Sequence, residues 1–220
     1  MYDVSSRLKD FYDNHVRLGS DRRGKLAEHR DLNLDRLRGG LDDLAAETGR
    51  PHNSFSYWRN QGGYAMHTLN QATDNDYDID VAVVFNKADL PNDPLQARQR
   101  VRDALSKRCT NFTKEPEARH NAVTVWYQDG YHIDFAVYRT WQEFNGFQFI
   151  TKIEHASSTW KERDPMQVND WFTKVVTEKS PTYQPLIGRL PTVSSQQMRR
   201  IVRFVKWFCR SRTSFNLPGG

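Results

Sequence analysis

The chain has 220 residues, of which 37% are hydrophobic and 27% are charged. This composition excludes an intrinsically disordered chain, and the length is sufficient for a full hydrophobic core. No apolar run approaches the roughly 20 residues that cross a bilayer, and the start of the chain lacks the apolar segment of a signal peptide. We therefore expect a cytoplasmic protein without membrane association.

Net charge and cysteine content exclude fewer functions than length and composition do. The net charge of +5 suits an anionic partner, but it does not separate a nucleotide ligand from a solvated basic surface. RNA binding is compatible with this charge and is not specifically indicated. The two cysteines, Cys109 and Cys209, have neither metal-ligand spacing nor the pattern of a disulfide framework, which favours a reducing compartment.

Residues 1–50 are predicted to form an N-terminal helical arm. Two patterns with helical spacing indicate this: Val4, Leu8 and Phe11, and then Leu34, Leu37, Leu41 and Leu44. Gly39-Gly40 predicts a weakened or kinked point in the second helix, and Thr48-Gly49-Arg50-Pro51 predicts its end. We expect the helical pair to pack behind a sheet. A basic segment lies between the two patterns (Arg22, Arg23, Lys25 and Arg30). An alternative is that the arginines of this segment contact a phosphate-bearing ligand.

The central stretch, Gln61 to Phe85, carries the strongest chemical signal. Residues 53–60 alternate polar and aromatic side chains, which predicts a short strand leading into Gly62-Gly63 and a short helical pattern. A glycine pair between a strand and a helix can present backbone N–H groups to a phosphate. The next strand starts with Asp78 and Asp80, which point to one face because side chains alternate along a strand. Its other face is apolar and is predicted to be buried (Ile79, Val81, Val83 and Phe85).

A third acid occupies a similar setting further along the chain. Asp93-Pro94 predicts the start of a helix that runs toward Cys109. Asp129-Gly130 then predicts a hairpin turn between strands at 122–127 and 131–138. Asp134 lies on the second of these strands, opposite its apolar face. Phe147 and Phe149 suggest another short strand.

The last third of the chain is predicted to be mainly helical. Asp164-Pro165 predicts a helix start, and residues 181–191 read as a linker. Residues 194–212 form an amphipathic pattern with an apolar stripe (Met198, Ile201, Val205 and Phe208) and a basic stripe on the opposite side (Arg199, Arg203, Lys206 and Arg210). Such a basic stripe is more often solvated than part of a ligand site. The closing Asn216-Leu-Pro-Gly-Gly220 leads us to expect that a longer protein has been cut here.

Three carboxylates on one patch could hold two Mg²⁺ or Mn²⁺ ions at the spacing used for nucleotidyl transfer. Adjacent carboxylates repel each other, and a divalent cation removes that repulsion. Hard oxygen ligands favour these ions over zinc, and the histidines show no zinc-binding spacing. His132 lies two residues before Asp134 on the same face. It could tune the site, but we favour its interpretation as an ordinary polar strand residue.

These motifs resemble a known family. Gln61-Gly-Gly-Tyr-Ala-Met66, Tyr77-Asp-Ile-Asp-Val-Ala-Val-Val-Phe85 and His132-Ile-Asp-Phe-Ala-Val-Tyr138 are similar to the three signatures of the polymerase-β-like nucleotidyltransferase superfamily. More narrowly, they resemble the bacterial cGAS/DncV-like nucleotidyltransferases (CD-NTases) of CBASS antiphage defence. Residues 30–37 and 199–207 are also similar to that group.

The resemblance implies an α+β (mixed α/β) fold with a mixed β-sheet. We expect a nucleotidyltransferase core at 51–160 and the start of an incomplete C-terminal helical lobe at 161–220. The implied reaction joins nucleoside triphosphates, ATP and/or GTP among them, into a cyclic di- or trinucleotide messenger with release of pyrophosphate. The messenger would activate a separate effector acting in trans.

The resemblance also implies roles for particular residues. Asp78, Asp80 and Asp134 match the catalytic, metal-binding carboxylates for two Mg²⁺ or Mn²⁺ ions. Lys206 matches a lysine that contacts the donor triphosphate, and the glycine-turn residues match the rest of the nucleotide site (Gln61, Gly62, Gly63 and Tyr64). The family usually has serine where this chain has Gly63, so one hydroxyl contact to the triphosphate is missing.

Two other functions remain as alternatives. One keeps the chemistry but makes a linear oligoadenylate, or transfers the nucleotide to RNA or protein. The other is a catalytically weakened nucleotide-binding module, which the glycine at position 63 would favour.

Overall fold

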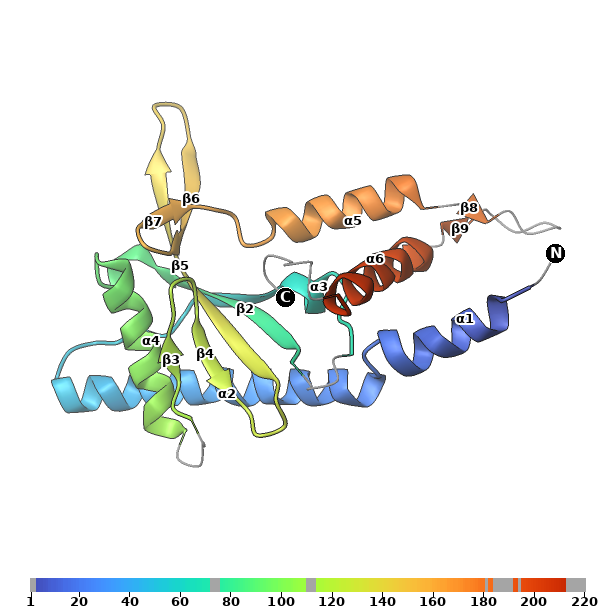
Figure 1. Ribbon diagram of the computed structural model, residues 1–220. Helices are drawn as coiled ribbons and strands as arrows, with labels where there is room; N and C mark the ends of the chain where they lie inside the picture. Colours follow the sequence, from blue (N-terminus) through green and yellow to red (C-terminus); the bar gives the residue numbers. More distant parts are fainter. Residues whose placement is uncertain are drawn as a thin grey trace.

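The computed structural model describes residues 3–71, 76–109, 114–180, 182–183, 192–193 and 195–212. Within them the chain is an α+β protein built on a mixed sheet, as expected (Figure 1). Its strands are β1 (Tyr57–Gln61), β2 (Asp78–Asn86), β3 (Glu117–Ala118), β4 (Val123–Trp126), β5 (His132–Phe144), β6 (Phe149–Ala156), β7 (Trp160–Glu162), β8 (Thr182–Tyr183) and β9 (Thr192–Val193). Its α-helices are α1 (Ser5–Phe11), α2 (Ser20–Thr48), α3 (Gly62–Ala65), α4 (Pro94–Arg108), α5 (Gln167–Lys179) and α6 (Ser195–Arg210).

The main sheet has the order β1-β2-β5-β4-β3, and β6 and β7 extend it beyond β5. Only β2 and β5 run parallel; each of the other described pairs is antiparallel. The parallel register places Asp78 opposite His132 and Asp80 opposite Asp134. The polar residues at the two strand starts are therefore direct neighbours.

One face of the sheet forms the main core with α2 and α4. The predicted apolar face of β2 is fully buried there, as are Leu37 of α2 and Val101 of α4. Asp93 caps α4 because its Oδ1 accepts a hydrogen bond from the backbone N–H of Gln96 at 2.7 Å. Figure 1 shows α2 and α4 on the same side of the sheet. The opposite face carries the acids.

The N-terminal arm differs from the prediction in two respects. The basic segment at 22–30 and Gly39-Gly40 belong to a single continuous helix, α2, which ends at Thr48 as predicted. A Cβ on Gly40 would lie 1.8 Å from the backbone oxygen of Ala104, so this glycine permits close contact between α2 and α4. The first helical segment does not pack behind the sheet: α1 leads through a π-helical turn (Tyr12–Val16) to the side of α6. Phe11 contacts Trp207 there, at 4.9 Å between ring centroids.

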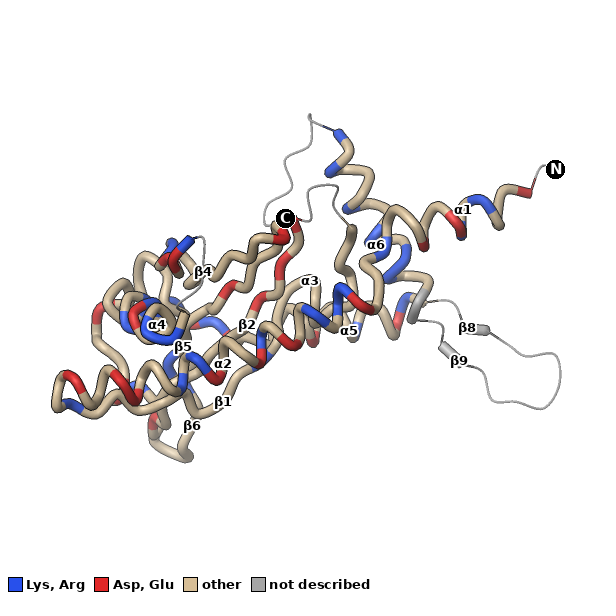
Figure 2. The backbone as a smooth tube through the Cα atoms, turned by 90° about the horizontal axis from the view of Figure 1, so that it is seen from below, with Lys and Arg blue, Asp and Glu red and all other residues tan. Residues whose placement is uncertain are grey.

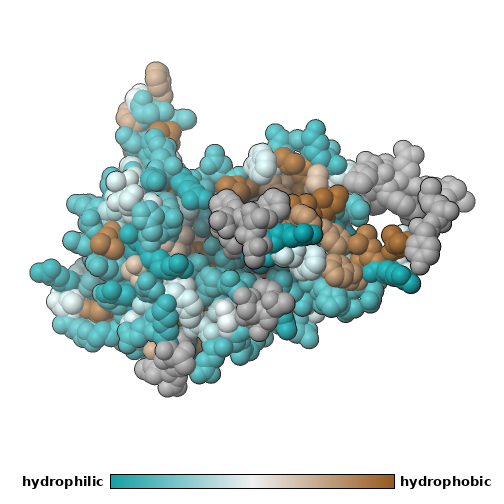
Figure 3. Space-filling model, in the orientation of Figure 1, coloured by the Kyte–Doolittle hydropathy of each residue, from teal (hydrophilic) through white to brown (hydrophobic). Residues whose placement is uncertain are grey.

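Helix α6 has the opposite orientation to the one that its sequence predicts. Ile201, Val205 and Phe208 are about half exposed, whereas Arg203 is only 8% exposed. Figure 3 shows hydrophobic atoms gathered over α5 and α6, and Figure 2 shows basic segments recurring along α6. Arg199, Arg203 and Lys206 of the predicted solvated stripe thus face the protein, whereas Arg210 is exposed.

Other boundaries shift by a few residues. The predicted strand at 53–60 begins only at Tyr57, and the predicted end of β5 at Tyr138 moves to Phe144 because β5 and β6 form a long projecting hairpin. Phe147 lies in the turn of that hairpin and is 95% exposed. Residues 182–183 of the predicted linker pair with residues 192–193 as strands, while 181, 184–191 and 213–220 lie outside the described residues.

No helix among the described residues combines the length and apolar character needed to cross a membrane.

Candidate active site

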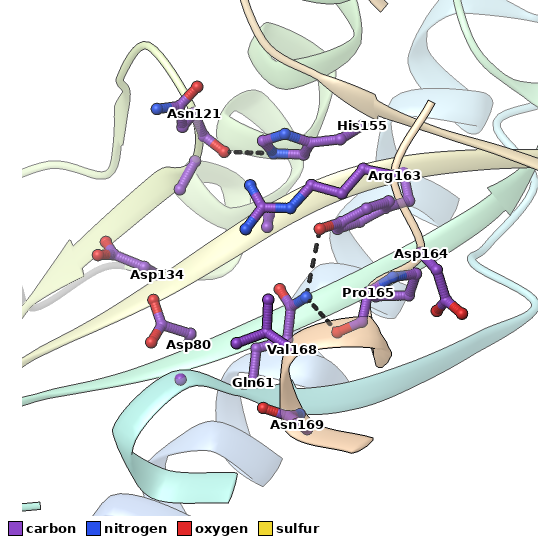
Figure 4. Close-up of a pocket in the computed structure, with 14 residues that line it drawn as sticks. Gln61, Asp80, Asn121, Asp134, His155, Arg163, Asp164, Pro165, Val168 and Asn169 are labelled. Carbon is purple, nitrogen blue, oxygen red and sulfur yellow. Dashed lines mark hydrogen bonds between the residues drawn. The ribbon is translucent and has the colours of Figure 1, made fainter. Parts of the chain in front are cut away.

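The three acids predicted from the sequence meet on one face of the sheet. Asp80 and Asp134 occupy paired positions on β2 and β5, and Figure 4 shows their carboxylates side by side. One ligand atom each from Asp78, His132 and Asp134 lies within 4.8 Å of the others. Alternation along two parallel strands in equal register is sufficient to produce this cluster.

Asp80 is held close to the glycine turn. Gly62 has a φ of +59°, in the left-handed region that favours glycine. A Cβ at this position would lie 1.9 Å from Oδ2 of Asp80. The first glycine of the pair is therefore required by both its backbone conformation and the approach of a carboxylate.

Burial and mutual repulsion raise the pKa values of Asp78 and Asp80. Loss of hydration raises the pKa of Asp80 to about 7, and the nearby charges of Asp78 and Asp134 add to this effect. Burial likewise raises the pKa of Asp78. Ionising these groups together is costly without a cation, so the donor set fits a hard divalent ion such as Mg²⁺ or Mn²⁺.

His132 is more closely involved with the acids than an ordinary polar strand residue. Its Nε2 lies 3.4 Å from Oδ2 of Asp134 and 4.0 Å from Oδ2 of Asp78. The hydrogen bond to Asp134 raises the pKa of His132, and the protonated ring then offsets part of the negative charge. Thr124, which the sequence analysis did not single out, donates its hydroxyl to Oδ1 of Asp134. Its position opposite Asp134 on β4 is the signal that could have found it.

Lys206 reaches the same site from the other end of the sequence. A Cβ on Gly63 would lie 3.6 Å from Nζ of Lys206, so the ammonium group is next to the glycine turn. Burial, followed by the charge of Arg210, lowers the pKa of Lys206, while Asp78 and Asp80 act in the opposite direction. Among the described residues, no hydrogen bond or ion pair engages this ammonium group.

The remaining predicted nucleotide-binding residues have contacts within the protein. Gln61 donates from Nε2 to the hydroxyl of Tyr138 at 3.2 Å and to the backbone oxygen of Pro165 at 2.7 Å. The guanidinium of Arg23 lies 4.2 Å above the ring of Tyr64. Gln61 lines the cavity beside Asp80, and Tyr64 follows Gly63 in α3. These contacts hold the glycine turn against α2 and against the segment that precedes α5.

The basic segment of α2 contacts protein groups, which agrees with its interpretation as a structural arm. Arg23 donates to the backbone oxygen of Tyr64 at 3.1 Å, and Lys25 pairs with Asp129. Arg30 pairs with Asp31 and lies 4.7 Å above the ring of Trp58. Three of the four basic residues therefore fasten α2 to neighbouring elements.

Comparisons with known proteins agree with this geometry. Residues 56–138 match the family model for the nucleotidyltransferase domain of cyclic GMP-AMP synthase DncV-like proteins. The matched segment contains the glycine turn and all three acids. Residues 56–138 are thus similar to a DncV-like nucleotidyltransferase domain, and the three acids lie inside the matched segment.

Solved structures share the fold of this chain. Vibrio cholerae DncV cyclic AMP-GMP synthase with nonhydrolyzable GTP matches with a TM-score of 0.67 and 14% identity, over 100% of this chain and 70% of that one. E. coli MS115-1 CdnC with ATP matches with a TM-score of 0.63 and 18% identity, over 97% of this chain and 61% of CdnC. Bradyrhizobium diazoefficiens CdnG with GTP matches with a TM-score of 0.53 and 17% identity, over 77% of this chain and 45% of CdnG. This chain thus spans about three fifths of CdnC. No curated protein sequence matches it.

Proposed function

We propose that this chain is a divalent-metal-dependent nucleotidyltransferase that joins nucleoside triphosphates into a cyclic di- or trinucleotide second messenger. The single observation that carries the proposal is the convergence of Asp78, Asp80 and Asp134 on one face with Lys206 beside Gly63. Nucleotidyl transfer needs carboxylates at the reacting phosphate and a cation at the triphosphate, and both are present here.

The division of the chain follows the same proposal. Residues 1–50 form the helical arm, 51–160 the nucleotidyltransferase core and 161–220 the start of a helical lobe. Lys206 belongs to this last part and faces the acids of the core, so a triphosphate would lie between them.

The reaction can be assigned to the residues of the site. The oxygen of an acceptor ribose hydroxyl forms a bond to the α-phosphorus of the donor, and the bond from that phosphorus to the pyrophosphate oxygen breaks. The leaving pyrophosphate takes the electron pair. We assign to Asp134 the role of accepting the hydroxyl proton, and the contacts of its carboxylate with Thr124 and His132 support this choice because they orient it. Lys206 stabilises the charge of the departing pyrophosphate.

Asp78 and Asp134, which lie close to the His132 ring, would hold the divalent ions together with Asp80, the residue opposite Asp134 on β2. When bound, these ions increase the acidity of the attacking hydroxyl and offset the charge on the triphosphate. A second transfer within the linear product, whose own triphosphate then acts as donor, closes the ring and releases a second pyrophosphate.

The solved relatives support the choice of substrates. The structures of CdnC with ATP and of CdnG with GTP show which nucleotides were bound to those proteins. For this chain we propose ATP and GTP as substrates. We also propose a role in antiphage (CBASS) signalling, in which the messenger activates an effector acting in trans.

The test is incubation of the purified chain with α-labelled ATP and GTP and with Mg²⁺ or Mn²⁺. We expect pyrophosphate release and a phosphatase-resistant product from the wild type, and neither from the double variant Asp78→Ala, Asp80→Ala. Asp35→Ala removes an exposed acid from α2 and should retain activity. A phosphatase-sensitive product would instead support a linear oligonucleotide synthase. Nucleotide binding without pyrophosphate release would support the weakened binding module.

A further inference from the structure

A cavity of about 280 Å³ begins at the carboxylates and continues along the same face of the sheet. Asp80 and Asp134 lie at one end, and His155 lies at the other (Figure 4). Tyr138, four residues beyond Asp134 on β5, also lines the cavity. Ala136 lies between them, two residues beyond Asp134 on β5, and lines the cavity. Its small side chain leaves space between the acids and Tyr138.

Arg163 projects into this cavity from the segment between β7 and α5. Figure 4 shows its side chain extending across the space in the direction of Asp134. The backbone N–H of Arg163 is bonded to the carbonyl of Ile153, which fixes the point from which the side chain starts. Within the described part of the chain, its guanidinium forms no hydrogen bond or ion pair. It therefore has donors available for a ligand.

The positions of the two cations separate two binding regions. Lys206 lies beside Gly63 and does not line the cavity, so the highly charged donor triphosphate belongs on the Lys206 side. The cavity begins at Gly62, Asp80 and Asp134 and extends toward His155 and Arg163. A ligand there would place one group next to Asp134 and another next to Arg163. An acceptor nucleoside has this form, with a ribose hydroxyl at one end and a base at the other.

The chemistry of arginine then restricts the base. A guanidinium carries only donors, and guanine offers two acceptors, O6 and N7, on one edge. Adenine offers N7 beside an amino group, which is itself a donor and cannot accept from arginine. The cavity is also near the lower size limit of small-molecule sites, which suits a nucleoside better than a complete triphosphate.

We propose that this cavity receives the nucleoside of the acceptor nucleotide, and that Arg163 selects a guanine base there. The acceptor role rests on the proposed transferase function. The base selection is a property of the cavity itself and can be measured without turnover.

Ligand-observed NMR with guanosine, inosine and adenosine tests the base selection. Inosine keeps O6 and N7 but lacks the 2-amino group of guanosine, so it is a matched probe for the contact to Arg163. We expect guanosine and inosine to bind the wild type and adenosine to bind at least fivefold more weakly. Arg163→Ala should remove this preference, whereas Lys161→Ala, which removes a nearby charge outside the cavity, should keep it.

Turnover tests the acceptor role. With ATP as fixed donor, Arg163→Ala should lower kcat/KM for GTP by roughly 5- to 100-fold. Equal binding of adenosine and guanosine, or unchanged selectivity in Arg163→Ala, would overturn the assignment of Arg163. Intact guanosine selectivity in a protein that releases no pyrophosphate would instead overturn the proposed function and leave the base assignment standing.

Discussion

The backbone of Gly62 lies against the carboxylate of Asp80, with no room for even one methyl group between them. The glycine turn and the first acidic strand are therefore a single structural unit. Gly62→Ala should displace Asp80 and strain a backbone with φ of +59°, so we expect transferase activity to fall by about 100-fold. Steady-state pyrophosphate release measures this. Unchanged activity with a stable fold would contradict the contact.

Substitution of the neighbouring glycine, Gly63, should improve the site rather than damage it. A side chain at Gly63 would meet only the flexible end of Leu69, at 2.9 Å, with Nζ of Lys206 at 3.6 Å. Gly63→Ser therefore adds a hydroxyl next to the proposed triphosphate cation at small steric cost. We expect roughly tenfold tighter binding of a nonhydrolyzable ATP analogue, measured by calorimetry. Gly63→Ala is the control for the added volume alone, and an equal gain from alanine would show that the hydroxyl is not responsible.

The raised pKa of Asp80 predicts a pH dependence. Because its pKa in the folded chain is about 7, against 3.8 as the ordinary value, ionisation of Asp80 destabilises the metal-free protein as pH rises through this range. Metal-free Asp80→Asn should therefore have a higher Tm than the wild type at pH 8 and a similar Tm at pH 4. Mn²⁺ should raise the Tm of the wild type more at pH 8 than at pH 6, because protons compete with the ion for Asp80. Thermal unfolding measures both effects.

The packing of α6 leads us to expect that Arg203 contributes more to the free energy of unfolding than Val205 does. Arg203 is buried and donates to the hydroxyl of Tyr12 and to the backbone oxygen of His67. Arg203→Ala should lower the free energy of unfolding by about 2–3 kcal/mol. Val205, on the same helix, is 55% exposed, so Val205→Ala should change it by less than about 0.5 kcal/mol. Urea unfolding of the two variants compares them, and the reverse order would show that α6 packs through its apolar stripe.

The acid cluster could be predicted from the sequence because it depends on short-range rules. Alternation places Asp78 and Asp80 on one face, and the similar surroundings of Asp134 suggested a neighbouring strand. The equal register of β2 and β5 brought His132 into the cluster, although the sequence alone favoured an ordinary strand position. Arg163 could not be found in this way, because its direction depends on the segment between β7 and α5.

The orientation of α6 shows the limit of sequence patterns most clearly. A helical pattern gives two stripes and does not state which one faces the protein. Here the backbone oxygens of Met66 and His67, close to the glycine turn, accept hydrogen bonds from Arg199 and Arg203. These long-range contacts outweigh the usual preference for burying the apolar side. Asn70 adds a further bond to the backbone oxygen of Arg203 at 2.8 Å.

The attachment of α6 also has a consequence for the order in which the site is built during synthesis. The carboxylates lie on β2 and β5, which leave the ribosome before α6, and domains begin to fold from their N-terminal side. Lys206 lies on the same helix as Arg203, which donates to the hydroxyl of Tyr12, a residue 191 positions earlier. A nascent chain would therefore possess its acidic centre before Lys206 is held beside Gly63, because that step needs contacts between segments far apart in the sequence.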